Sequence, residues 1–207
     1  MDRTKEAIDI LNKNWTGTFT KPAPNLYPHQ WNWDSGFIAL GNAQIDISKV
    51  ITEYQSLFSG QWENGFLPHI VFGQPTGKYF PEPDFWQSTR NNEAPKDIQT
   101  SGITQPPVHG FVLKKIFDRH SADKTFVTFL KDLYPKLVAL HQYYYQYRNP
   151  LMNGLITIRH PWEPGTDNSP IWDDALRRLQ VNRTQLPAYV RRDLQNPKAA
   201  NHRPTQE

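Results

Sequence analysis

The class of this fold follows from one segment, Ile47-Ser48-Lys49-Val50-Ile51-Thr52-Glu53-Tyr54-Gln55-Ser56-Leu57-Phe58. Its apolar side chains stand at positions 47, 50, 51, 54, 57 and 58, a spacing that places them on one face of a helix. No proline or glycine interrupts the pattern. The segment therefore predicts an amphipathic helix with a buried apolar face.

Two shorter helices are predicted before this segment. The apolar pattern within residues 7–14 indicates one that ends near Asn14. The second is expected to begin at Asp34 or Ser35, whose side chains can cap a helix N-terminus, and to end at Gly41. The two prolines within residues 21–24 predict extended chain between these helices.

Three further helices are predicted after it. One begins within residues 104–107, since proline is tolerated in a first turn. A long one begins at Ser121 or Asp123 and extends to Tyr147, with Pro135 expected to kink it or split it. The last begins at residues 169–170 and includes Leu179.

The other segments show little regular pattern. Residues 60–104 have no sustained period but hold many aromatic side chains, which is typical of a functional loop rather than disorder. Residues 155–158 carry a brief strand pattern. The sequence therefore predicts an all-α protein of about six helices, with its chemistry on loops at helix ends.

Composition excludes several classes of function. The chain has no cysteine, so it forms no disulfide or thiolate metal site. Its net charge is +3, and no groove-reading motif accompanies its basic residues, so nucleic acid is not expected as a partner. No leader pattern and no apolar run of membrane-spanning length is present, so we expect a cytoplasmic protein without a membrane partner.

No cofactor site is apparent either. The histidines are scattered without the spacing of a helix-borne metal site, so no metal is expected. No glycine-rich segment is followed by Gly-Lys-Ser/Thr, and no Gly-x-Ser-x-Gly occurs. Phosphoryl transfer and serine nucleophile chemistry therefore lack support.

Residues 160–174 combine four acidic side chains and two tryptophans without any lysine or arginine. Such a mixture suits a sugar site, where a ring lies on an indole and a carboxylic acid faces the glycosidic oxygen. Asp167 is the candidate acid, with Trp162 and Trp172 expected to shield it and raise its pKa. Alternatively, Asp167 caps the helix near Pro170, a role that Asn168 or Ser169 could equally fill.

Other acids in the chain are also candidates. Glu163, Asp173 and Asp174 are alternatives to Asp167, although the last two fall in a first helical turn that favours acids without catalysis. Asp34 follows Trp31 and Trp33 and could accept hydrogen bonds from sugar hydroxyls. Its alternative role is the helix N-cap, and the two roles are compatible.

Four motifs together resemble glycoside hydrolase family 63: Trp-Asp-Ser-Gly-Phe at 33–37, Asn-Gly-Phe-Leu-Pro-His at 64–69, Thr-Gln-Pro-Pro at 104–107 and Gly-Thr-Asp-Asn-Ser-Pro-Ile-Trp-Asp at 165–173. The branch most similar to them is that of bacterial mannosylglycerate and glucosylglycerate hydrolases. Trehalases and mannosyl-oligosaccharide glucosidases are more distant.

The resemblance implies an (α/α)6 barrel and an inverting α-glycosidase that needs no cofactor. Asp167 then matches the general acid, and the substrate is a small carbohydrate. The other matching residues line the sugar site: Tyr27, Trp31, Trp33, Asp34, His69, Tyr79, Gln105 and Trp162.

An (α/α)6 barrel has twelve helices, and an inverting glycosidase needs a second carboxylate to activate water. The sequence supplies about six helices, and nothing after Asp174 resembles the family's glutamate base. We therefore expect residues 1–207 to be the N-terminal half of one catalytic domain, with an exposed face and little or no hydrolysis by itself. The alternatives are a non-catalytic carbohydrate-binding remnant, an enzyme similar to trehalases or oligosaccharide glucosidases, and a helical protein-interaction module.

Overall fold

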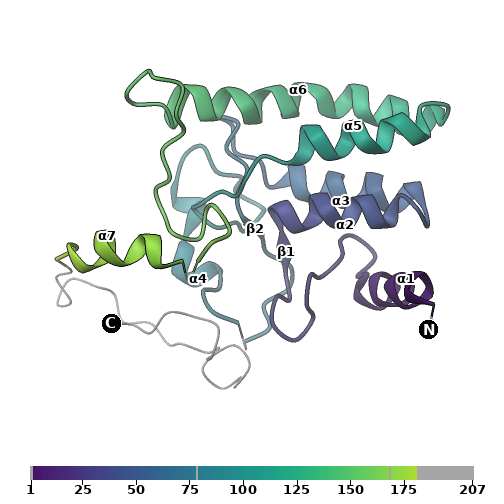
Figure 1. Cartoon of the computed structure of the whole chain (residues 1–207), viewed down its shortest axis with the longest axis horizontal. Coiled ribbons are helices and arrows are strands. Elements are labelled where there is room, and N and C mark those ends of the chain that lie inside the picture. Colours follow the sequence, from purple (N-terminus) through teal and green to yellow (C-terminus); the bar gives the residue numbers. More distant parts are fainter. Residues whose placement is uncertain (1, 78, 168, 181–207) are drawn as a thin grey trace.

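The computed structural model describes residues 2–77, 79–167 and 169–180 (Figure 1). Its α-helices are α1 (Arg3–Asn14), α2 (Asn32–Asn42), α3 (Ile47–Ser59), α4 (Pro83–Trp86), α5 (His109–His120), α6 (Lys124–Tyr147) and α7 (Asp173–Arg177). Two 3-10 helices, η1 (Ser88–Arg90) and η2 (Pro170–Trp172), and two short strands, β1 (Gln30–Trp31) and β2 (Ile70–Val71), complete it. The predicted all-α class is confirmed.

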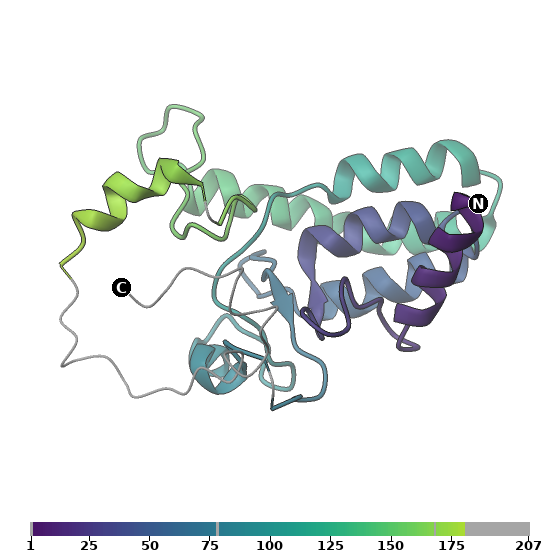
Figure 2. The same ribbon diagram turned by 60° about the horizontal axis from the view of Figure 1, so that its bottom comes forward.

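Helices α2, α3, α5 and α6 lie side by side and enclose the main core, with α1 against α2 (Figures 1 and 2). The apolar face predicted for α3 is buried there through Val50, Tyr54, Leu57 and Phe58. The irregular segments gather at the end of this bundle where α2 and α5 begin and α6 ends (Figure 1). This end therefore carries the loops on which the sequence placed the chemistry.

Two of the predicted helix starts are wrong. Helix α2 begins at Asn32, two residues before the expected cap, because β1 leads directly into it and no side chain caps it. Helix α5 begins at His109 rather than within residues 104–107. There the chain is extended because its groups are bonded elsewhere: the Thr104 hydroxyl donates to the carbonyl of Leu67 at 2.7 Å, and the Tyr144 hydroxyl to the carbonyl of Gln105 at 2.7 Å.

Helix α6 begins where one of the two predicted caps placed it, since Asp123 accepts from the backbone N–H of Phe126 at 2.9 Å. It continues without a break through Pro135, so the predicted split is wrong. Pro135 and Lys131, four residues earlier, are both exposed, so the carbonyl that the proline leaves unpaired lies where water can reach it.

Two predictions near the end of the described chain are also corrected. Residues 155–158 form no strand; they are exposed, with Thr157 N–H bonded to the carbonyl of Arg148 at 2.6 Å. The last helix consists of η2 and the short α7, so Leu179 lies beyond it. Apolar side chains are exposed along this region, with Leu151 at 77% and Met152 at 88% exposure.

The long segment between α3 and α5 is structured, as its aromatic content predicted. Strand β2 pairs antiparallel with β1, joining Gln30 to Val71 and Trp31 to Ile70. Beside them, Trp31, Ile70 and Tyr79 form a second apolar cluster. Within the described ranges, none of the helices combines the length and hydropathy that a membrane crossing requires.

Gly65 ends a turn in this segment, with its N–H bonded to the carbonyl of Trp62 at 2.9 Å, and substitution there tests how the segment is held. Its φ is +88°, and a Cβ atom would clash with the carbonyl oxygen of Ala139 in α6. We expect Gly65→Ala to lower the free energy of unfolding by roughly 2–4 kcal/mol, measured by denaturant titration.

Gly154→Ala is the matched control, because Gly154 has a φ of +80° but nothing within 4 Å of its Cβ position. It should cost only about 1 kcal/mol, from backbone strain alone. Equal losses in the two variants would show that contact with α6 is unimportant.

Candidate active site

Four segments that are distant in the sequence meet at the loop end of the bundle. The backbone N–H of Asn32 donates to the carbonyl of His69 at 2.9 Å, and that of Trp33 to Oε1 of Gln105 at 3.2 Å. A Cβ atom on Gly165 would lie 2.7 Å from the ring of Trp33, so the loop of residues 160–167, called the acidic loop below, packs directly against this indole. The structure thus brings together segments 31–34, 69, 105 and 162–165.

Asp34 lies in the first turn of α2 and is half-buried. The structure excludes its predicted role as N-cap, because Trp31 occupies that position. Burial raises the pKa of its carboxyl group to about 6, against a smaller opposing effect of a backbone hydrogen bond. A carboxyl group of this kind can both accept and donate hydrogen bonds near neutral pH.

His69 is buried beside this turn. Its Nδ1 lies 2.5 Å from Oγ of Ser101, and its ring contacts the indoles of Trp86 at 5.6 Å and Trp162 at 6.4 Å between centroids. The sequence prediction did not include Ser101 or Trp86. Trp86 is one of the aromatic side chains that argued for structure within residues 60–104, but no local pattern links it to His69.

The predicted aromatic wall is only partly exposed. Trp31 and Tyr79 are 6% and 5% exposed, packed edge to face at 5.4 Å and covered by His29 and Ile70. Neither presents an open ring face among the described residues, and the place of both in the sugar site stays a prediction. Both instead support the neighbouring half-buried rings, of which Tyr27 contacts Trp31 at 4.9 Å.

Asp167, the predicted acid, is exposed, so the expected shielding by Trp162 and Trp172 is absent from the described residues. The indole of Trp172 instead donates to the carbonyl of Thr166 at 2.8 Å.

The capping alternative for Asp167 is also wrong, because Ser169 caps the following helix by accepting from the N–H of Ile171 at 3.4 Å. The other proposed cap, Asn168, lies outside the described residues. The cap of this helix is therefore Ser169.

Glu163 serves as an anchor rather than an acid. Its carboxylate forms a bidentate, buried ion pair with Arg148 at the end of α6, with Nη1 to Oε2 at 2.9 Å and Nη2 to Oε1. It also accepts from the backbone N–H of Arg159 at 2.8 Å. Burial opposes ionisation, but these bonds together hold the pKa of Glu163 below its usual value, so it stays ionised at neutral pH.

The two remaining acidic candidates are Asp173 and Asp174, which are exposed in the first turn of α7. Asp174 forms an exposed ion pair with Arg177 at 3.0 Å. Across the described ranges, no three His, Asp or Glu side chains gather as they would around a metal ion.

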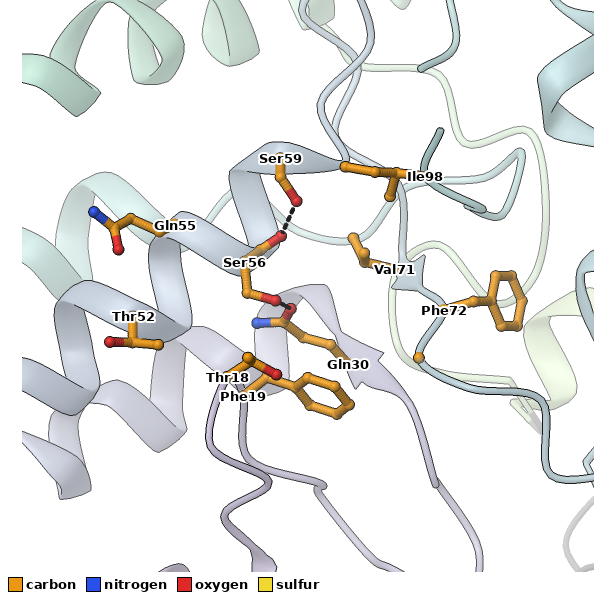
Figure 3. Close-up of a pocket in the computed structure, with 11 residues that line it drawn as sticks. Thr18, Phe19, Gln30, Thr52, Gln55, Ser56, Ser59, Val71, Phe72 and Ile98 are labelled. Carbon is orange, nitrogen blue, oxygen red and sulfur yellow. Dashed lines mark hydrogen bonds between the residues drawn. The ribbon is translucent and has the colours of Figure 1, made fainter. Parts of the chain in front are cut away.

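A pocket of about 470 Å³ lies beside α3 and the strands (Figure 3). It holds none of the predicted site residues, and Gln30 within it is bonded to Ser56 at 2.7 Å. The side chains that line it do not titrate near neutral pH: Thr18, Phe19, Gln30, Thr52, Gln55, Ser56, Ser59, Val71, Phe72 and Ile98. This pocket therefore cannot supply acid–base catalysis.

Residues 27–207 match the family described as the mannosylglycerate hydrolase MGH1-like glycoside hydrolase domain. A mannosylglycerate hydrolase from Rubrobacter radiotolerans is 42% identical over 193 residues, covering 93% of this chain and 43% of the relative. A glucosylglycerate hydrolase from Mycolicibacterium hassiacum is 39% identical, covering 90% of this chain and 43% of the relative.

Solved structures agree with these matches. A glycoside hydrolase family 63 mannosylglycerate hydrolase from Thermus thermophilus, in complex with Tris and D-glycerate, has a TM-score of 0.82 and 43% identity, covering 94% of this chain and 45% of that one. Its complex with glucose gives a TM-score of 0.78 and 42% identity. The motif resemblance is thus confirmed, and the chain spans less than half the length of these relatives.

The raised pKa of Asp34 predicts a pH dependence of stability. The folded state holds its proton up to about pH 6, whereas an unfolded aspartate loses it near 3.8. Between these values the free energy of unfolding falls as the pH rises, because the folded chain keeps a proton that the unfolded chain has lost. Asp34→Asn should therefore raise the free energy of unfolding by roughly 1–3 kcal/mol at pH 7 and leave it unchanged below about pH 4.

Denaturant titration at several pH values measures this effect. Asp173→Asn is the control, because this acid is exposed in the first turn of another helix. A gain from Asp34→Asn that is constant with pH would contradict the assignment.

The ion pair of Glu163 with Arg148 predicts a pH dependence of stability opposite to that of Asp34. Its folded pKa is lowered, so its contribution is present above the unfolded value of 4.5 and is lost as the pH falls through the lower folded value. Glu163→Gln should lower the free energy of unfolding at pH 7 by about 3–5 kcal/mol, because it leaves a buried guanidinium without its counter-ion.

Asp174→Asn breaks an exposed ion pair and should change stability by less than about 1 kcal/mol. Thermal melts of both variants at pH 7 make the comparison. Similar small effects would mean that the Glu163 pair does not hold the acidic loop.

Proposed function

Because the chain belongs to the family of mannosylglycerate hydrolase-like glycoside hydrolase domains, we propose that it contributes the acid side of an inverting α-glycosidase site. The substrate is a small glucosyl or mannosyl solute such as a sugar-glycerate. Asp167 is the general acid of this site, and it donates a proton to the glycosidic oxygen as the bond to the sugar breaks.

One observation carries the proposal: the acidic loop lies directly on the proposed sugar wall. The backbone of Gly165 contacts the indole of Trp33, next to Asp34, and Asp167 is two residues further along the loop. Sugar hydroxyls need carboxylate and amide partners beside an aromatic face, and Asp34, Gln105 and Trp33 supply them. His69 and Trp162 complete this proposed sugar subsite.

The ligands of the solved relative support the substrate class. The Thermus thermophilus enzyme was crystallised with glucose and with D-glycerate, the two kinds of unit that a sugar-glycerate joins. We extend this to the present chain because its four motifs stand together at one site. Glucosyl- and mannosyl-glycerate are therefore the first ligands to test.

The general base completes the mechanism. An inverting enzyme places a second carboxylate about 6.5–9.5 Å from the acid, where it activates a water molecule. Glu163 is unsuited to this role because it is bound to Arg148. We assign the base to the part of the family's length that the chain does not cover, and residues 1–207 to the N-terminal half of one (α/α)6 domain.

A cytoplasmic location stays a proposal, and cell fractionation would test it. Among the alternatives, a non-catalytic carbohydrate-binding role is favoured by one observation: Asp167 is exposed, whereas a general acid is usually covered by apolar groups. Trehalose as a ligand tests the trehalase-like alternative.

Calorimetry on the 207-residue chain, together with an assay for released sugar, tests binding of a sugar-glycerate against the trehalase-like alternative. We expect heat of binding with glucosyl- or mannosyl-glycerate, none with trehalose, and no released sugar. Asp34→Asn should weaken binding about tenfold, which corresponds to about 1.4 kcal/mol for a lost charged hydrogen bond. Asp173→Asn should leave the affinity unchanged.

The acid itself is tested in a full-length relative, where the base is present. Changing the counterpart of Asp167 to Asn in the Thermus thermophilus enzyme should lower kcat by at least about a hundredfold, as expected for loss of general acid catalysis. Unchanged turnover would remove this residue from the role of acid.

A further inference from the structure

Asn32 clamps three successive carbonyl groups at the proposed sugar site. Its backbone N–H donates to the carbonyl of His69 at 2.9 Å. Its side-chain Nδ2 donates to the carbonyls of Leu67 at 3.3 Å and Pro68 at 3.0 Å. One residue at the start of α2 therefore fixes the backbone that carries the His69 ring.

The clamp fixes where the proton lies on His109. Both Nδ2 hydrogens of Asn32 are used, so its Oδ1 is the acceptor in the 2.7 Å contact with Nε2 of His109. Nε2 must then carry the hydrogen, and Nδ1 accepts from the hydroxyl of Tyr54 at 3.4 Å. The ring is 0% exposed, and burial, with a smaller effect of His141, lowers its pKa to about 3, so it is neutral.

We propose that His109 is a positioning residue for the sugar site: as a fixed Nε2–H donor to Asn32, it sets the placement of His69 and Trp33. This inference rests on the proposed function insofar as that site binds a sugar. His109 touches no substrate atom in this role. It acts through Asn32, which directly precedes Trp33 and is bonded to the backbone of residues 67–69.

Close packing lets the ring control this backbone. A Cβ atom on Gly36 of α2 would lie 2.9 Å from Cγ2 of Val108 and 3.5 Å from Nδ1 of His109. The start of α5 therefore packs directly against α2 at Gly36, within one helical turn of Trp33 and Asp34. Loss of the His109 donor would leave the buried Oδ1 of Asn32 unpaired, which favours rotation of its amide and release of the clamp.

The first measurement is nitrogen-15 NMR of the histidine rings in the 207-residue chain. The His109 signals are assigned by their disappearance in His109→Gln. We expect the Nε2–H tautomer, with no change in the ring signals between pH 8 and pH 5. An Nδ1–H tautomer, or titration within that range, would overturn the proposal.

Two variants then test positioning. His109→Gln places an amide nitrogen where Nε2 stands, so it should keep the affinity for the sugar-glycerate within about threefold of wild type. His109→Leu fills the space without a donor and should weaken binding at least about tenfold. It should also shift the NMR signals of the Trp33 indole and the His69 ring, which His109→Gln should leave in place.

Leu140→Ala is the control for lost stability, because Leu140 is buried in α6 and shares no hydrogen bond with the clamp. It should lower the melting temperature without changing affinity or the Trp33 and His69 signals below the melt. Equal binding by wild type and His109→Leu would overturn the positioning role.

If wild type itself binds no sugar, the proposed function fails for this chain, and the NMR signals alone decide the positioning role. Shifted Trp33 and His69 signals in His109→Leu would then support it. Unshifted signals would overturn it.

Discussion

The first turn of α2 is buried at its N-terminal side, so its polar groups must be satisfied from other parts of the chain. One of these partners is Glu53 on α3, whose carboxyl group is fully buried and so needs several hydrogen bonds. It accepts hydrogen bonds from the N–H of Thr20 at 2.7 Å, Nε2 of Gln30 at 3.0 Å and Oγ of Ser35 at 2.5 Å. No cation pairs with it among the described residues, and burial raises its pKa to about 7. These bonds fix β1 and α2 against α3, and thereby determine where Trp33 and Asp34 stand.

The acidic loop depends on a different anchor. Arg148 ends α6, and its ion pair with Glu163 holds the loop at its base. Gly165 holds the loop at its tip, because only a residue without a side chain can pass so close to the Trp33 ring. The loop is thus tied both to the bundle and to the sugar wall. The two tethers set the position of the acidic loop relative to Asp34.

The sequence predicted well what is decided locally. The apolar face of α3 follows from its own spacing, and the Asp123 cap from a bond to Phe126 three residues away. It failed where the partner is remote: the N–H of Trp33 is satisfied by Gln105, 72 residues later, so α2 needs no local cap. Likewise, motif resemblance identified the acidic loop, but nothing near Glu163 reveals its pairing with Arg148. Long-range pairing of polar groups is therefore the part that periodicity cannot supply.

The two acids of the proposed site are in contrasting environments. Asp34 is partly buried and already has a raised pKa, whereas Asp167 is exposed. A general acid needs its pKa raised towards neutrality, and burial against apolar groups is the usual cause. Under the proposed mechanism, that cover must come from the substrate and from the part of the family's length beyond this chain. The described residues would then build the side of the site that holds the sugar, while the apolar cover of Asp167 would be complete only once the site is closed around it.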